Sequence, residues 1–385
     1  MGTSHVCGIY LLSAITSARQ AALAVKKMGM EKSDLKNADV VKCDNCGANM
    51  VFDVASGALK CPYCSSSGAI EAEAAIAERD YFSYIGKGDV EETGISYLCK
   101  NCNAHTYFSE FETAHNCPFC GAACILDADQ IPGLKPDSLL PFKVTKEEAS
   151  ECGKKWIKGK LFAPSKAKKQ FSVDNIRGVY SPCFSYSSNT ASTYNGQLGK
   201  HYTVTVGSGK NRHTEVRTRW FNVSGNYDKY FPNVLIESSK TLNQRQMDKL
   251  GPFDIGNAKE YKKEFLAGFS AERYDNSLEN CFKIAEDKMT EEIKRGILSR
   301  YSYDVVGYLN VNTRYLSVRF RHILMPLWVC GFYFKTKLYN FFVNGRTGRS
   351  TGKSPVSALR VTIAALLALG LIALIVYFLK SSGVI

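Results

Sequence analysis

The sequence predicts a multidomain protein with two small β zinc ribbons, an α+β middle domain of mostly antiparallel strands and one C-terminal transmembrane helix. Three observations predict this. Four C-x-x-C pairs occupy the first third of the 385-residue chain. Residues 139–345 mix helical periodicity with alternating, β-branched runs. Residues 361–379 carry no charged side chain.

Changes in composition set the predicted boundaries. From the N-terminus they are a poorly ordered leader (1–39), zinc ribbon 1 (40–68), a helical spacer (69–95), zinc ribbon 2 (96–128), the α+β domain (139–345), a basic linker (346–360) and the transmembrane helix (361–379). Residues 1–30 contain no acid and a single arginine, Arg19, which fits a secretory or transit peptide only in part. Whether residues 1–29 are a targeting segment or precede a start at Met28 or Met30 stays open. The spacer helix is expected at 71–79, a run of strong helix formers.

The cysteines of the four pairs are the predicted metal ligands. In each half fourteen residues separate the two pairs, and every cysteine of the first half recurs 56 positions later. This spacing is typical of a four-cysteine zinc site, where two tight turns supply four thiolates to one tetrahedral ion. The sets are Cys43, Cys46, Cys61 and Cys64 in ribbon 1, and Cys99, Cys102, Cys117 and Cys120 in ribbon 2. Because four protein ligands leave no open position, we expect two structural zinc ions.

Each ribbon should contain a hairpin between its pairs. In ribbon 1, residues 50–52 and 58–60 can pair across a turn that contains Gly57. In ribbon 2, residues 106–108 would return through 113–115. Gly47 and Gly121 directly follow a ligand cysteine, whereas Ser65 departs from that pattern. Cys61-Pro62-Tyr63-Cys64 also has the sequence of a glutaredoxin-type redox site. Because no buried parallel strand precedes it, we favour zinc ligation over redox activity.

The middle domain shows two periodicities and no catalytic motif. Helices are expected at 146–156, 258–273 and 277–298, and strands at 201–206, 215–223, 304–309, 315–320 and 324–335. The chain lacks G-x-S-x-G, H-E-x-x-H and G-x-G-x-x-G motifs. His201, His213, His322 and Cys183 could form a site only by converging in space, so we expect no enzyme.

The C-terminal stretch is long enough to cross a bilayer. Nineteen residues at about 1.5 Å each span roughly 28 Å, close to the hydrocarbon thickness. Four basic residues precede the stretch and only Lys380 follows it, which predicts a single-pass protein with its N-terminal domains in the cytoplasm. That reducing compartment also preserves zinc thiolates. The predicted lipid-facing basic residues are Arg346, Arg349, Lys353 and Arg360.

The charge distribution argues against a nucleic-acid role for the ribbons. The whole chain carries a net charge of +13, but residues 1–130 hold ten Lys and Arg against sixteen Asp and Glu. Residues 131–385 hold the remaining 39 basic and 20 acidic side chains. Each zinc with four thiolates adds a further formal −2, whereas a phosphate-binding surface should be basic.

The order of motifs resembles a prokaryotic family of membrane-anchored tandem zinc-ribbon proteins. Beyond the cysteine pairs, the resemblance lies in Leu140-Pro141-Phe142-Lys143, Gly178-Val179-Tyr180-Ser181-Pro182, Pro252-Phe253-Asp254, Met325-Pro326-Leu327-Trp328 and Asn344-Gly345-Arg346-Thr347-Gly348. Members are called transcription-factor-IIB-type zinc-ribbon-containing proteins, and some are labelled primosomal helicase-like. The resemblance implies membrane-stress systems with flotillin-like or phage-shock-type partners.

Two functions from different classes are therefore expected. The first is a membrane-anchored, non-enzymatic adaptor whose ribbons dock a cytoplasmic protein partner. The alternative is a nucleic-acid-associated ribbon protein, of transcription or replication type, held at the membrane. The acidic ribbons favour the first.

Overall fold

The computed structural model describes residues 36–38, 41–73, 78–85, 95–99, 105–108, 112–116, 123–125, 134–171, 176–209, 212–239, 242–272 and 274–381. Its helices are α2 (Lys146–Lys158), α3 (Ser165–Gln170), α4 (Gln244–Leu250), α5 (Leu278–Leu298) and α6 (Ala358–Ser381). Its strands are β1 (Lys36–Ala38), β2 (Val51–Asp53), β3 (Ala58–Lys60), β4 (Ser67–Gly68), β5 (Arg79–Asp80), β6 (Ile95–Cys99), β7 (His105–Phe108), β8 (Glu112–Asn116), β9 (Ala123–Ile125), β10 (Ser138–Leu139), β11 (Arg177–Val206), β12 (His213–Glu237), β13 (Lys259–Glu260), β14 (Ser270–Glu272), β15 (Val305–Phe334), β16 (Lys337–Asn344) and β17 (Ser350–Gly352).

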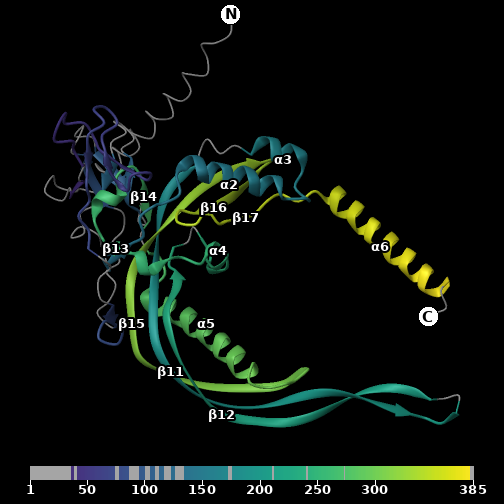
Figure 1. Cartoon of the computed structure of the whole chain (residues 1–385). Helices are drawn as coiled ribbons and strands as arrows, with labels where there is room; N and C mark the ends of the chain where they lie inside the picture. Colours follow the sequence, from purple (N-terminus) through teal and green to yellow (C-terminus); the bar gives the residue numbers. More distant parts are fainter. Residues whose placement is uncertain are drawn as a thin grey trace, which may run out of the picture.

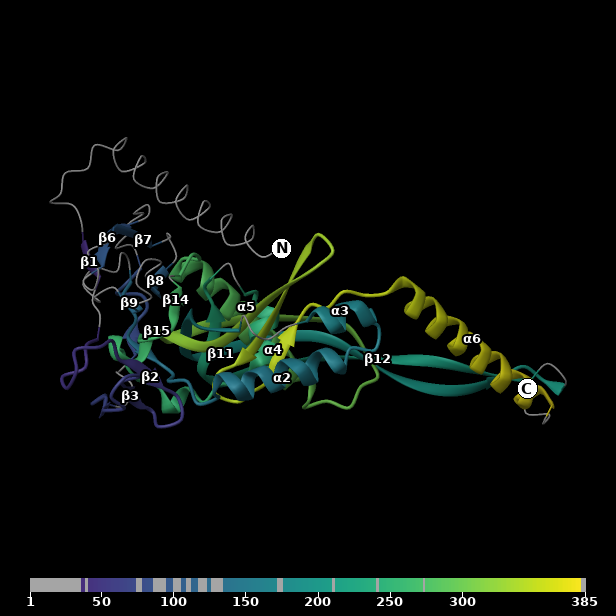
Figure 2. The same cartoon turned by 90° about the horizontal axis from the view of Figure 1, so that it is seen from above.

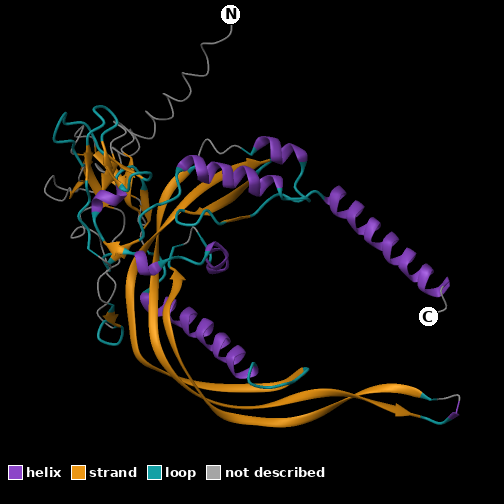
Figure 3. Cartoon of the chain, in the orientation of Figure 1, coloured by secondary structure: helices purple, strands orange, loops and turns teal. Residues whose placement is uncertain are grey.

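Three long antiparallel strands build the middle domain. β11 pairs with β12 on one side and with β15 on the other. β15 also pairs with β16, and β16 pairs with β17. Shorter strands add to these edges, among them β10 and β14 in parallel. Figure 1 and Figure 3 show the long strands bending together, with α5 on the inner side of the bend. The expected domain of mostly antiparallel strands is confirmed, and the strands form one large sheet.

Helix α5 covers the sheet with an apolar stripe at helical spacing. Ser277 caps it as expected, its side chain accepting from the Asn280 amide at 3.2 Å. Cys281, Ala285 and Ile293 are fully buried on the stripe, which contacts β11, β12 and β15. Burying this face against the strands forms one of the main apolar clusters of the domain.

Two projections leave the body on the same side. β15 begins at Val305, opposite Gly199 of β11. Beyond Gly199 the β11–β12 hairpin continues without β15 as a two-stranded arm. Helix α6 leaves from the other end of the sheet, near α3 (Figures 1 and 2). Within the described part of the chain, Ala358–Phe378 is the one segment long and apolar enough to be a candidate membrane span, and it is exposed along its length.

Several expected elements are corrected. The three strands predicted within 304–335 are the single strand β15, because its polar middle pairs with β11, as in Asn195–Asn310. The helix predicted at 258–273 is wrong: the segment holds β13, a 3₁₀ turn (Lys263–Leu266) and β14. Gly268 there has φ +90°, which an α-helix excludes.

Two boundaries also move. The spacer helix predicted at 71–79 is wrong at both ends, since residues 71–73 are not helical and β5 pairs with β15; residues 74–77 lie outside the described part. The linker predicted at 346–360 begins too early, because β17 pairs with β16 and belongs to the sheet. β1 lies inside the predicted leader and pairs with β6.

Candidate metal centre

Ribbon 1 brings four cysteine sulfurs together. The Sγ atoms of Cys43 and Cys64 lie 3.6 Å apart, and those of Cys46 and Cys61 lie 3.5 Å apart. All four sulfurs fall within 4.8 Å of one another. Zinc–thiolate bonds of about 2.3 Å place tetrahedral sulfurs about 3.8 Å apart. The group could therefore hold a metal ion of this size with only small shifts.

Two matching turns aim the sulfurs. The Gly47 amide donates to the Cys43 carbonyl at 2.8 Å, and the Ser65 amide donates to the Cys61 carbonyl at 3.0 Å. Gly47 has φ +71° and Ser65 has φ +60°. The departure at Ser65 is therefore one of sequence only, because Ser65 adopts the left-handed conformation at a cost of roughly 1–2 kcal/mol.

Ser66 supports the cluster and was missed from the sequence. Its Oγ lies 2.9 Å from the Sγ of Cys43 and 3.1 Å from that of Cys64. Hydrogen bonding to this hydroxyl lowers the pKa of Cys43 and lowers that of Cys64 to about 5. The duplication does not reveal Ser66, because Ala122 stands 56 positions later.

Cys46 shows the opposite tendency. The Ala48 amide lowers its pKa, but hydrogen bonding with Cys61 and Cys64 outweighs this and raises the pKa to about 12. Thiolates this close repel one another, so the full set can ionise only with a cation among them. The donor set therefore fits a thiophilic metal ion.

The second cysteine set is only partly described. Cys99 ends β6, and Cys102, Cys117 and Cys120 lie outside the described residues, so the second metal site stays a prediction. The first hairpin is confirmed, with Phe52 opposite Leu59. The second is wrong: β7 pairs with β6, and β8 pairs with β9 and β14. Pairing with β14 places β8 in the main sheet instead.

Ribbon 1 is packed onto the middle domain. The Phe52 amide donates to the Ala267 carbonyl at 2.9 Å. The Phe52 ring centroid lies 5.4 Å from that of Phe265 and 6.3 Å from that of Phe269. Phe52 and Leu59 are buried in one apolar cluster with residues of the sheet. The four-cysteine cluster is therefore fixed to the domain.

The other candidate catalytic residues do not converge. His201 and His213 lie exposed on the arm, whereas His322 and Cys183 are buried. His322 pairs with Phe184, the neighbour of Cys183, so the two side chains point to opposite faces of the sheet. Burial lowers the pKa of His322 to about 4 and holds the pKa of the Cys183 thiol well above its usual value. A neutral, buried thiol is inert.

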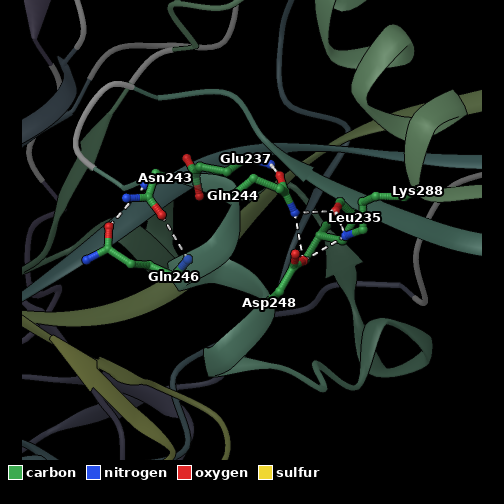
Figure 4. A network of polar contacts seen from close by, with 7 residues as sticks. All are labelled: Leu235, Glu237, Asn243, Gln244, Gln246, Asp248 and Lys288. Carbon is green, nitrogen blue, oxygen red and sulfur yellow. Dashed lines mark hydrogen bonds and ion pairs between the residues drawn. The ribbon is translucent and has the colours of Figure 1, made fainter. Parts of the chain in front are cut away.

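Glu237 is a buried acid beside Cys183 that the sequence did not single out. Ser181 Oγ and the Ser239 amide donate to its Oε1 at 2.8 and 3.0 Å, and Cys183 Sγ lies 3.5 Å from its Oε2. Burial raises its pKa to about 7 against these bonds. Its amide donates to the Gln244 side chain, which joins β12 to the α4 network in Figure 4.

The predicted lipid-facing residues make protein contacts. Arg346 forms an ion pair with Asp254 and is mostly buried. Arg349 and Arg360 donate to backbone carbonyls, while Lys353 is exposed. Their contact with lipid stays a prediction, and the ion pair shows that Arg346 belongs to the folded domain.

Comparison with known proteins leaves the function open. No family model matches the chain, and no solved structure matches it. The chain is 28% identical over 322 residues to a Bacillus subtilis (strain 168) protein described as uncharacterized protein YdjG. That alignment covers 82% of this chain and 90% of the relative. The similarity extends over most of both chains but assigns no activity.

Proposed function

We propose that this chain is a membrane-anchored, non-enzymatic zinc-ribbon adaptor that recruits a cytoplasmic protein partner. The observation that carries the proposal is the separation between ribbon 1 and the candidate membrane span α6. Ribbon 1 lies at one end of the body and α6 leaves from the other, in both views of Figures 1 and 2. A folded domain between a candidate membrane span and a candidate metal centre suits the presentation of the ribbon away from the bilayer.

Zinc is the proposed ion. Four thiolates are soft ligands, and their spacing matches tetrahedral zinc coordination. With all four positions taken by protein, the ion stabilises the ribbon rather than activating water. The 56-residue duplication supports a second, equivalent ion in ribbon 2.

The partner is proposed to be a protein that contacts the outer tip of ribbon 1. Tyr63, between two ligand cysteines, is 81% exposed, and tyrosine is enriched at protein interfaces. Flotillin-like or phage-shock-type partners rest on the sequence resemblance alone. A cytoplasmic orientation agrees with the positive-inside bias and with reduced thiols.

Photo-crosslinking in living cells tests this function. A crosslinking side chain replaces Tyr63 in the full chain, and a matched control replaces Tyr230, which is 55% exposed on β12. We expect a discrete protein adduct from position 63 that is absent from position 230, and retention of the chain in membranes at alkaline pH. Equal adducts from both positions would refute docking at the ribbon, and alkaline release would refute the anchor.

The arm supports nucleic-acid binding as a second candidate. Arg217 and Arg219 lie exposed near the exposed aromatic rings of Tyr202 and Trp220. Such groups can contact phosphates and stack on bases. Duplex or single-stranded DNA binding that weakens steeply with salt, and is lost in Arg217→Gln with Arg219→Gln, would favour this candidate over the adaptor.

A further inference from the structure

We propose that the surface formed by the end of α2, the loop after it and α3 seats the body on an anionic bilayer beside the entry point of α6. We call this surface the α2–α3 patch; it consists of Lys158, Leu161, Phe162, Lys166 and Lys169. The inference rests on the proposed membrane anchoring and adds a lipid-binding surface outside the four basic residues predicted from the sequence.

Backbone contacts hold the patch against the start of α6. The Ser357 amide donates to the Phe162 carbonyl at 2.8 Å. The Arg360 guanidinium donates to the Leu161 carbonyl at 3.0 Å and to the Ala163 carbonyl at 2.8 Å. Because these bonds join the loop to the first turn of the candidate span, a membrane that contains α6 brings its headgroups to the loop. Figure 2 shows α3 beside the chain that leads into α6.

The apolar side chains of the patch face solvent. Leu161 is 77% exposed and Phe162 is 44% exposed. Val356 and Leu359, which flank the same contact, are 64% and 69% exposed. Apolar side chains gathered at one place on a surface mark an interaction site, and headgroup-level insertion would remove them from water.

The charge of the patch selects the kind of bilayer. Residues 154–170 hold seven lysines and no acid, and Lys158, Lys166 and Lys169 are exposed. Each basic residue near an anionic surface strengthens the contact roughly fivefold. A second copy of this chain that presented the same patch would bring the same positive charge and be repelled, so anionic lipid is the occupant that we propose.

Tryptophan quenching in vesicles tests the proposal on the full chain. The Phe162→Trp variant is reconstituted in phosphatidylcholine, or in an equal mixture with phosphatidylglycerol, each brominated near the headgroup. The matched control is Tyr63→Trp, on the distant ribbon. Relative to the native chain, whose Trp156, Trp220 and Trp328 give the background, we expect additional quenching in the anionic mixture from the tryptophan at position 162 and none from that at position 63.

Charge variants separate the patch from the anchor. Lys158→Gln, Lys166→Gln and Lys169→Gln together should weaken the contact roughly a hundredfold and reduce quenching to its level in phosphatidylcholine. The control triple, Lys249→Gln, Lys259→Gln and Lys283→Gln, should not change it. If quenching at position 162 is weak in anionic vesicles while the chain resists alkaline extraction, the lipid contact of the α2–α3 patch is refuted and the membrane anchoring stands. If alkali releases the chain from the vesicles, the membrane anchoring by α6 is refuted. Quenching that ignores the three lysines overturns the choice of anionic lipid.

Discussion

Replacing Glu237 with glutamine should remove a loss of stability that the native protein suffers as pH rises. Burial raises the pKa of this carboxyl from 4.5 to about 7. Between these values the folded state keeps a proton that the unfolded chain releases, so the free energy of unfolding falls as pH rises. At about 1.4 kcal/mol per pKa unit, the loss is on the order of 3 kcal/mol. Glutamine keeps an oxygen that can accept from Ser181 and Ser239.

Thermal unfolding of the full chain in neutral detergent, followed by tryptophan fluorescence, measures this difference. The variant and the native protein should unfold at similar temperatures at pH 5, and the variant should unfold roughly 10 °C higher at pH 8. His322 works in the opposite sense, since its depressed pKa adds stability as pH rises, but it acts equally in both proteins. Exposed Glu147→Gln is the control. A difference that stays flat between pH 5 and pH 8 would show that Glu237 is not held protonated by burial.

Three further outcomes are expected. Elemental analysis should find two zinc ions in the native chain and one in Cys46→Ser or Cys99→Ser; a folded native chain without metal would contradict the proposed zinc sites. Phe52→Ala, which empties a buried ring site at a cost of about 3–5 kcal/mol, should speed proteolytic release of residues 41–73, unlike exposed Lys60→Ala. Protease outside intact cells should leave the chain before Arg360 uncut, and digestion of the ribbons there would reverse the proposed orientation.

Local features were readable from the sequence. The C-x-x-C turns place two sulfurs within a few residues, so their spacing predicted the four-cysteine cluster of ribbon 1. The apolar run near the C-terminus predicted the long helix α6, and the apolar stripe together with Ser277 predicted α5. In each case the signal lies within one turn, one helix face or one uninterrupted stretch, and needs no distant partner.

Distant partners decided the rest. The stretch around Asn310 is a strand because β11 runs beside it, and the described residues 258–272 hold no α-helix although their composition permits one. Arg346 was predicted as a lipid-facing residue of a basic linker, and only the tertiary structure places Asp254 against it as an ion-pair partner. Glu237 accepts a hydrogen bond from Ser181, and Ser66 lies against the sulfur of Cys43, because folding brings these distant residues close. Helices and C-x-x-C turns form their backbone hydrogen bonds within the same segment. Strand pairing, buried charges and the packing of ribbon 1 on the middle domain depend on contacts that only the tertiary structure supplies.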